Sequence, residues 1–128
     1  MSTQIDHAKD QARLQYESIA EMIIAYRQAE DYARDAALQR IQETPLSVEV
    51  RSGWHIPGVS DAPAAEFSIL LCTGGPAVRI IGTLSEHLEP DSACIQYQDW
   101  GTSWTDYPLI SEQIAIVLEY AQHFYYGE

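Results

Sequence analysis

The chain of 128 residues is long enough for one domain that buries a core without metals or disulfides. Its content of 46% hydrophobic and 10% aromatic residues is typical of a folded globular protein and excludes a largely disordered chain. The formal net charge of −12 repels the phosphates of nucleic acids and anionic membranes, so we expect neither as a direct partner.

The N-terminal residues 1–43 are expected to form one long helix or a pair of helices. From Ile5 to Glu43 the sequence lacks proline and glycine, and apolar residues recur every seven positions, at Ile5, Ala12, Ile19, Tyr26 and Ala33. Unbroken, such a helix would be about 55 to 60 Å long at 1.5 Å per residue, longer than one domain of this size covers. We therefore expect a break near Glu30, a projecting end, or a homodimer formed through the N-terminal helix.

Residues 44–128 are expected to form a four-stranded antiparallel meander and a C-terminal helix packed on it, in one domain with the N-terminal part. The four strands are "LSVEVRSGW" (46–54), "EFSILLC" (66–72), "AVRIIGTL" (77–84) and "ACIQYQDW" (93–100), separated by segments rich in Gly, Pro, Ser and Asp. The helix should run from an N-cap at Ser111 to about Tyr126. Its predicted inner face holds Ile114, Val117, Leu118, Ala121 and Tyr125. The predicted fold class is α+β, with the helices on one face of the sheet.

The charge is distributed unevenly along the chain. Residues 44–128 hold eleven acidic residues, and their basic residues are Arg51 and Arg79. An acidic surface of this kind either keeps the protein soluble or attracts a protein partner with a basic surface, and the sequence does not distinguish these interpretations.

No motif indicates catalysis, a cofactor or a metal. The four histidines (His7, His55, His87, His123) lie in different predicted elements without ligand-like spacing. The "CTGGPAVR" turn lacks the lysine of a phosphate-binding loop and leads into a strand. Candidate nucleophiles are Cys72, Cys94 and Ser103, but none lies in a known nucleophile motif, and cysteines inside strands are usually inert. We predict a protein that is not an enzyme.

The segment "QYQDWGTSWTDYP" (96–108) is the strongest candidate for a binding surface. Trp and Tyr are favoured at interfaces because they offer a large contact area together with a polar group. The alternative is that the tryptophans close one end of the core. The predicted partner-binding residues are Glu86, Glu89, Asp91, Asp99, Trp100, Trp104, Asp106 and Tyr107.

Four stretches resemble a family of small proteins encoded by phages, prophages and plasmids. They are "RIQETPLSVEVRSGW", "AEFSILLCTGGPAVRIIGTL", "YQDWGTSWTDY" and "FYYGE", and the resemblance covers about residues 39–128. The family contributes no catalytic residues. Small acidic proteins of mobile elements often inhibit host defence in the host cytoplasm, so the resemblance implies a function of that kind.

The resulting functional prediction is an anti-CRISPR inhibitor that blocks a basic nucleic-acid-binding or nuclease-recruiting surface of a CRISPR effector subunit. The alternatives are a homodimeric structural or assembly protein of the mobile element and an antirestriction protein that mimics DNA. The absence of an apolar run of about 18 residues, and the polar N-terminus, agree with a cytoplasmic location in the host cell.

Overall fold

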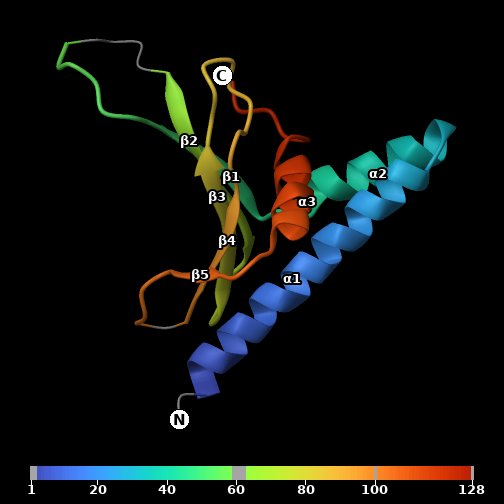
Figure 1. Ribbon diagram of the computed structural model, residues 1–128, viewed down its shortest axis with the longest axis horizontal. Coiled ribbons are helices and arrows are strands. Elements are labelled where there is room, and N and C mark those ends of the chain that lie inside the picture. Colours follow the sequence, from blue (N-terminus) through green and yellow to red (C-terminus); the bar gives the residue numbers. More distant parts are fainter. Residues whose placement is uncertain (1–2, 59–62, 100, 128) are drawn as a thin grey trace.

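The computed structural model describes residues 3–58, 63–99 and 101–127, with side chains from His7 onward, and shows an α+β fold of one sheet and three helices (Figure 1). In chain order the elements are α1 (Thr3–Gln28), α2 (Asp31–Glu43), β1 (Ser47–Ser52), β2 (Ala64–Cys72), β3 (Ala77–Thr83), β4 (Cys94–Gln98), β5 (Thr105–Tyr107) and α3 (Ser111–Ala121). The α+β class is therefore confirmed.

The sheet is an antiparallel meander in the order β1-β2-β3-β4-β5. The four predicted strands are present, each within a few residues of its expected bounds. A fifth strand, β5, was not predicted, because its three residues include two polar ones and show no alternation. It extends the sheet beyond β4, with Asp106 opposite Gln96.

The N-terminal part is a helical hairpin rather than one long helix. The chain leaves α1 at Ala29, Glu30 is extended, and Asp31 has a positive φ of 53°, which reverses the direction of the chain. α2 then returns along α1, where Arg40 Nη2 lies 3.1 Å from Glu21 Oε1, and the closed end of the hairpin projects from the body (Figure 1). The break near Glu30 is thus confirmed.

The apolar stripe of α1 is used inside the chain. Ala12, Ile19 and Ile23 are buried against the sheet, whereas the expected continuation into α2 is wrong because Ala33 is exposed; the side chain of Ile5 lies outside the described residues. The stripe that suggested a homodimer through this helix is therefore occupied by the protein's own sheet.

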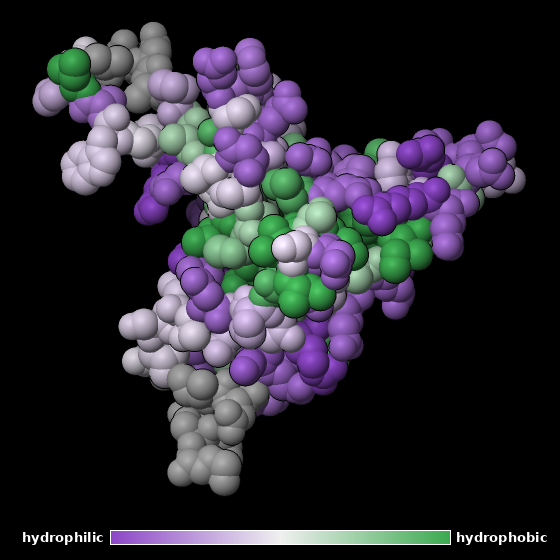
Figure 2. Space-filling model, viewed as in Figure 1, coloured by the Kyte–Doolittle hydropathy of each residue, from purple (hydrophilic) through white to green (hydrophobic). Residues whose placement is uncertain are grey.

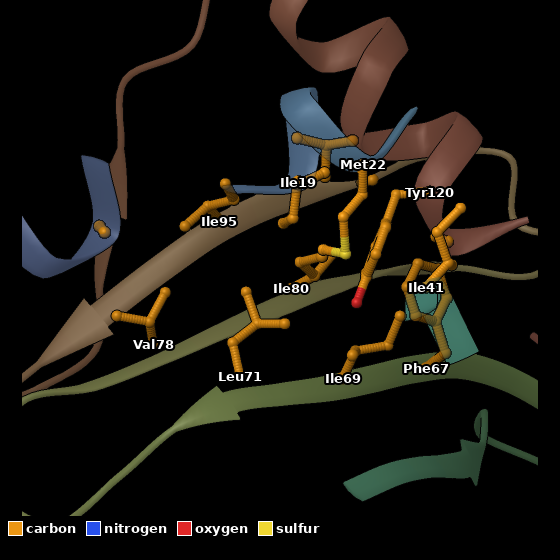
Figure 3. Packing of buried hydrophobic residues seen from close by; sticks show 14 of the residues in the cluster. Ile19, Met22, Ile41, Phe67, Ile69, Leu71, Val78, Ile80, Ile95 and Tyr120 are labelled. Carbon is orange, nitrogen blue, oxygen red and sulfur yellow. The ribbon is translucent and has the colours of Figure 1, made fainter. Parts of the chain in front are cut away.

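One face of the sheet, covered by α1 and α3, forms the core. Figure 3 shows Ile19 and Met22 of α1 above Ile80 and Ile95, while Tyr120 extends from α3 toward the strands. Helices on one face leave the other face of the sheet open to solvent.

The C-terminal helix is shorter than predicted and rotated. It ends at Ala121, and Gln113 rather than Ser111 caps its start, because Gln113 Oε1 accepts a hydrogen bond from the Ile110 N–H at 2.9 Å. Val117 and Ala121 are buried as expected, but Ile114 and Tyr125 are exposed, and Tyr120 takes the central position in the core. The prediction of the inner face was therefore wrong at Ile114 and Tyr125.

Figure 2 shows hydrophilic residues over the projecting end of the helical hairpin and hydrophobic residues gathered where α3 and α1 meet. Ile24 of α1 and Ile110 and Ile114 at the start of α3 are exposed. The surface on the helical side is therefore divided into a polar hairpin tip and an apolar centre.

Candidate functional site

The open face of the sheet carries a shallow groove with a volume of about 570 Å³. Its floor follows a row of residues that lie opposite one another across four strands: Glu49, Ser68, Ile81 and Cys94. Arg51 and Glu66 form an ion pair at one side, and Arg79 lies at another. The groove therefore has a floor of mixed polarity, with Ile81 and Cys94 at one end of the row and Ser68 and Glu49 at the other.

Arg79 connects this face to the predicted aromatic segment. Its guanidinium carbon lies 4.0 Å from the ring centroid of Trp104, and its Nε and Nη2 donate hydrogen bonds of 3.0 and 2.8 Å to Gln96 Oε1. Gln96 Nε2 in turn donates to Asp106 Oδ1 at 2.8 Å. Burial, together with the charge of Arg51, lowers the pKa of Arg79. The side chains of Trp104, Arg79, Gln96 and Asp106 thus form one connected network on the open face.

The aromatic segment does not act as a single patch. Trp104 is half-buried against Arg79, so it neither closes the core nor stands free. Tyr107 lies opposite Ile95 and packs against the core on the other face of the sheet. Trp100 lies outside the described residues. Of the predicted aromatic residues that are described, Trp104 is the one on the open face.

Asp99 begins the turn that precedes Trp104. Its backbone N–H donates to Thr102 Oγ1 at 2.9 Å, Thr102 Oγ1 donates to the Asp99 carbonyl at 2.9 Å, and Gly101 allows the turn with a φ of 75°. Asp99 itself is 7% exposed. Its carboxylate is therefore not part of the exposed acidic surface, contrary to its predicted role in binding a partner.

The other predicted acids lie in the connection between β3 and β4, residues 85–92, which we call the acidic turn. Ser85 organises this turn: its N–H donates to the Glu89 carbonyl at 2.8 Å, and its Oγ accepts from the N–H groups of His87 and Glu89 at 3.2 and 3.3 Å. Leu88, with a φ of 60°, packs against the core. Leu88 thus holds the turn against the core, while Glu86, whose side chain is 88% exposed, points into solvent.

The base of the acidic turn is held by a close approach of two backbone segments. A Cβ on Gly82 would overlap the carbonyl oxygen of Ser92 and lie 2.7 Å from Phe67 Cε1. The Thr83 N–H donates a hydrogen bond to Ser92 Oγ at 3.0 Å, and the Thr83 hydroxyl donates a hydrogen bond to Asp91 Oδ1. Asp91 therefore has a structural role in the turn in addition to its charge.

The structure separates the predicted binding residues into two groups. Glu86, Glu89 and Asp91 precede β4, whereas Trp104 and Asp106 come after it: Trp104 follows the turn at the far end of β4, and Asp106 lies beside the middle of the strand, opposite Gln96 (Figure 1). The C-terminal segment lies beside the first group, since Gln122 Nε2 donates to the Pro90 carbonyl at 3.3 Å. The acidic turn is therefore a distinct surface from the corner around Trp104.

Each arginine of the chain is held by the protein's own groups. Arg13 pairs with Asp10 and Glu17, Arg27 with Glu119, Arg40 with Glu21 and Arg51 with Glu66; Arg34 lies 4.5 Å from the ring centroid of Tyr26, and Arg79 lies on Trp104. Within the described residues, no lysine or arginine forms an ion pair with an acid of the acidic turn. Within the turn, His87 Nε2 lies 3.7 Å from Glu86 Oε1, a contact that is an ion pair only when the histidine is protonated. No arginine or lysine of the described residues therefore compensates the negative charge of this turn.

The two cysteines are free and poorly suited to nucleophilic attack. Burial raises the pKa of the Cys72 thiol and that of the Cys94 thiol, which disfavours the reactive thiolate at neutral pH. Among the residues with described side chains, no three His, Cys, Asp or Glu gather into a group that could hold a metal ion. None of the described helices is long and apolar enough to cross a membrane.

Comparison of the chain with models of protein families, with curated proteins and with solved structures finds no match.

Two residues of the open face, Arg79 and Gln96, were not predicted to be functional. The alternation of the fourth predicted strand places Gln96 on the face away from the core, and this pattern is visible in the sequence. The stacking of Arg79 on Trp104, 25 positions away, depends on the meander bringing β3 and β5 to opposite sides of β4, which no local pattern indicates.

Proposed function

We propose that the protein is a non-enzymatic binding protein of a phage or mobile element, and that its acidic turn holds a basic surface of a protein partner. The observation that carries this proposal is the arrangement of charge. The arginines are each engaged within the chain, and among the described residues no lysine or arginine pairs with Glu86 or Glu89, which stand in a hydrogen-bonded turn. A concentrated charge of one sign accelerates encounter with a surface of the opposite sign.

The rigidity of the turn favours binding over a purely solubilising role. Ser85 fixes the backbone on both sides of Glu86, and Leu88 is anchored in the core. Acids that are already ordered lose little conformational entropy when they contact a partner, whereas acids that only confer solubility need no fixed backbone.

The specific form of this function is inhibition of a CRISPR effector, by covering a basic surface that binds nucleic acid or recruits a nuclease. The support for this form is the resemblance described above, together with the uncompensated charge. The partner is a protein with a basic surface, and the location is the cytoplasm of the host cell.

The proposal is tested by capture of partners from a host lysate with tagged wild-type protein and two variants of equal charge. Glu86→Gln/Glu89→Gln removes two acids from the acidic turn. The matched control, Asp35→Asn/Glu112→Gln, removes two exposed acids from α2 and α3. We expect the wild type and the control to retain a protein that the turn variant loses.

A second arm uses purified CRISPR effector complexes of the common types at low salt. Binding and inhibition by the wild type, lost in the turn variant, would support the specific form. Undetectable binding to every effector would exclude the anti-CRISPR function. Equal loss of the captured partner in both variants would overturn the role of the acidic turn.

A further inference from the structure

The edge strand β1 offers its free side to a partner. Among the described strands β1 pairs with β2 alone, so alternate backbone N–H and C=O groups along its other side point outward. On the face shared with the core, Val48 is 37% exposed and Val50 is 46% exposed. Leu46 before the strand and Trp54 after it are also exposed. An edge strand with exposed apolar residues and free hydrogen-bonding groups is a ready surface for pairing with another strand.

We propose that β1 pairs antiparallel with β1 of a second copy of the chain, centred on Val50, so that the two five-stranded sheets join into one continuous sheet. This inference is independent of the function proposed above. It concerns self-association through β1, which is the edge strand at the other side of the sheet from β5. The helical hairpin is not part of the proposed interface.

The charges on β1 favour this register. In an antiparallel pair related by a two-fold axis perpendicular to the sheet, opposite side chains lie on the same face, so a residue at the centre faces its own copy. A centre at Glu49 or at Arg51 would place like charges opposite each other, which is destabilising. A centre at Val50 instead places Glu49 opposite Arg51 of the second copy, and does so twice.

The apolar residues follow the same register. Val50 meets Val50 of the second copy on the core side of the sheet, and Val48 meets Ser52. Extension by two residues brings Leu46 opposite Trp54, whose side chain is fully exposed in the single chain. Pairs of an aromatic and an aliphatic side chain directly opposite each other stabilise antiparallel sheets.

Arg51 can interact with acidic residues of both chains in the proposed pair. It already forms an ion pair with Glu66 across β1 and β2, and its side chain remains 78% exposed. In the proposed pair it would lie between Glu66 of its own chain and Glu49 of the second copy. The competing register, centred on Val48, places Glu49 opposite Ser47 and Arg51 opposite Pro45. In that register neither charged residue faces a residue of opposite charge.

The test exchanges charges so that only mixed pairs can form. Glu49→Arg places two arginines opposite each other in the homodimer. The double variant Arg51→Glu/Glu66→Arg places two glutamates opposite each other there, while it preserves an ion pair between β1 and β2 within the chain. We expect wild type to be dimeric by sedimentation velocity in the range from about 1 to 100 µM, and each variant to be monomeric.

Mixing the two variants should restore a one-to-one heterodimer by native mass spectrometry, because arginine then faces glutamate at both positions. Circular dichroism of each variant checks that it is folded; should either fail this check, Val50→Lys replaces it as the variant expected to be monomeric. A monomeric wild type, folded variants that remain dimeric, or folded variants that do not associate on mixing would each overturn the proposal.

Discussion

The guanidinium of Arg79 lies on the ring of Trp104, 4.0 Å from its centroid, on the face of the sheet opposite the described helices. This contact joins β3 to the segment before β5, and Gln96 continues it to Asp106 by a hydrogen bond. The short fifth strand is therefore held to the sheet by side chains as well as by its backbone.

Replacement of Arg79 by Gln should release Trp104. We expect a loss of about 1 kcal/mol in the free energy of unfolding, since a partly buried cation–π contact and the hydrogen bonds to Gln96 are lost. The emission of tryptophan should also shift to longer wavelength as Trp104 becomes more exposed. Urea unfolding and fluorescence measure the two effects.

Arg34→Gln is the matched control, because Arg34 lies 4.5 Å from the Tyr26 ring on the exposed hairpin. It should cost less stability and leave the tryptophan emission unchanged. Equal destabilisation by the two substitutions would contradict the role of Arg79.

Gly82→Ala should destabilise the protein by about 2 kcal/mol or more. The new methyl group would overlap the Ser92 carbonyl and the Phe67 ring, and neither the backbone at the base of the acidic turn nor the packed ring can move without cost. Thermal unfolding measures the loss. In Gly53→Ala the added Cβ lies 3.5 Å from Ala65 Cβ, an ordinary contact, so this control should change stability by no more than about 0.5 kcal/mol.

The two buried tyrosines of the C-terminal region should respond in opposite ways to the loss of the hydroxyl. Tyr126 donates a hydrogen bond of 2.7 Å to the Ala121 carbonyl, whereas the buried Tyr120 hydroxyl has no partner among the described residues. We expect Tyr126→Phe to cost about 1 kcal/mol and Tyr120→Phe to be neutral or stabilising, because an unsatisfied buried hydroxyl is itself unfavourable. Comparison of the two variants by chemical unfolding decides this; a larger loss for Tyr120→Phe would be contrary to the structure.

His123 should make stability depend on pH. Burial lowers its pKa below the ordinary value of 6.5; Glu119 opposes this shift and Arg34 adds to it. The unfolded chain then binds more protons than the folded one once the pH falls below about 6.5, so the contribution of the neutral ring is complete above that pH and is lost as the pH falls through the lowered pKa. The stability of wild type relative to His123→Gln should therefore decrease from about pH 7.5 to about pH 5. A constant or increasing difference would contradict the burial of a neutral His123.

Much of the fold could be predicted because alternation and breaking residues are local signals. The alternation of residues 94–98 predicts two distinct faces of a strand, and in β4 the face with Ile95 and Tyr97 is buried. The sequence predicted a break near Glu30 but not the residue at which the chain reverses, because Ala29, Ala33 and Ala36 are all compatible with a continuous helix.

The errors have tertiary causes. In α3 apolar residues surround the helix, so periodicity does not decide between Ile114 and Tyr120 for the core position, which depends on the direction from which the helix meets the sheet. The acids of the acidic turn and Trp104 lie close together in the sequence, but the acidic turn precedes β4 and Trp104 follows the turn at the other end of that strand. Acidic and aromatic residues that cluster in the sequence therefore need not form one surface in the folded protein.

The most direct test of the acidic turn is the rate constant of association with the captured partner as a function of salt. At an ionic strength of about 0.1 M, where screening extends over about 10 Å, Glu86→Gln/Glu89→Gln should associate several-fold more slowly than wild type and Asp35→Asn/Glu112→Gln. The difference should vanish near 1 M, where the screening length is about 3 Å. Equal rates for the turn variant and its control at low salt would contradict the claim that the acidic turn holds the partner.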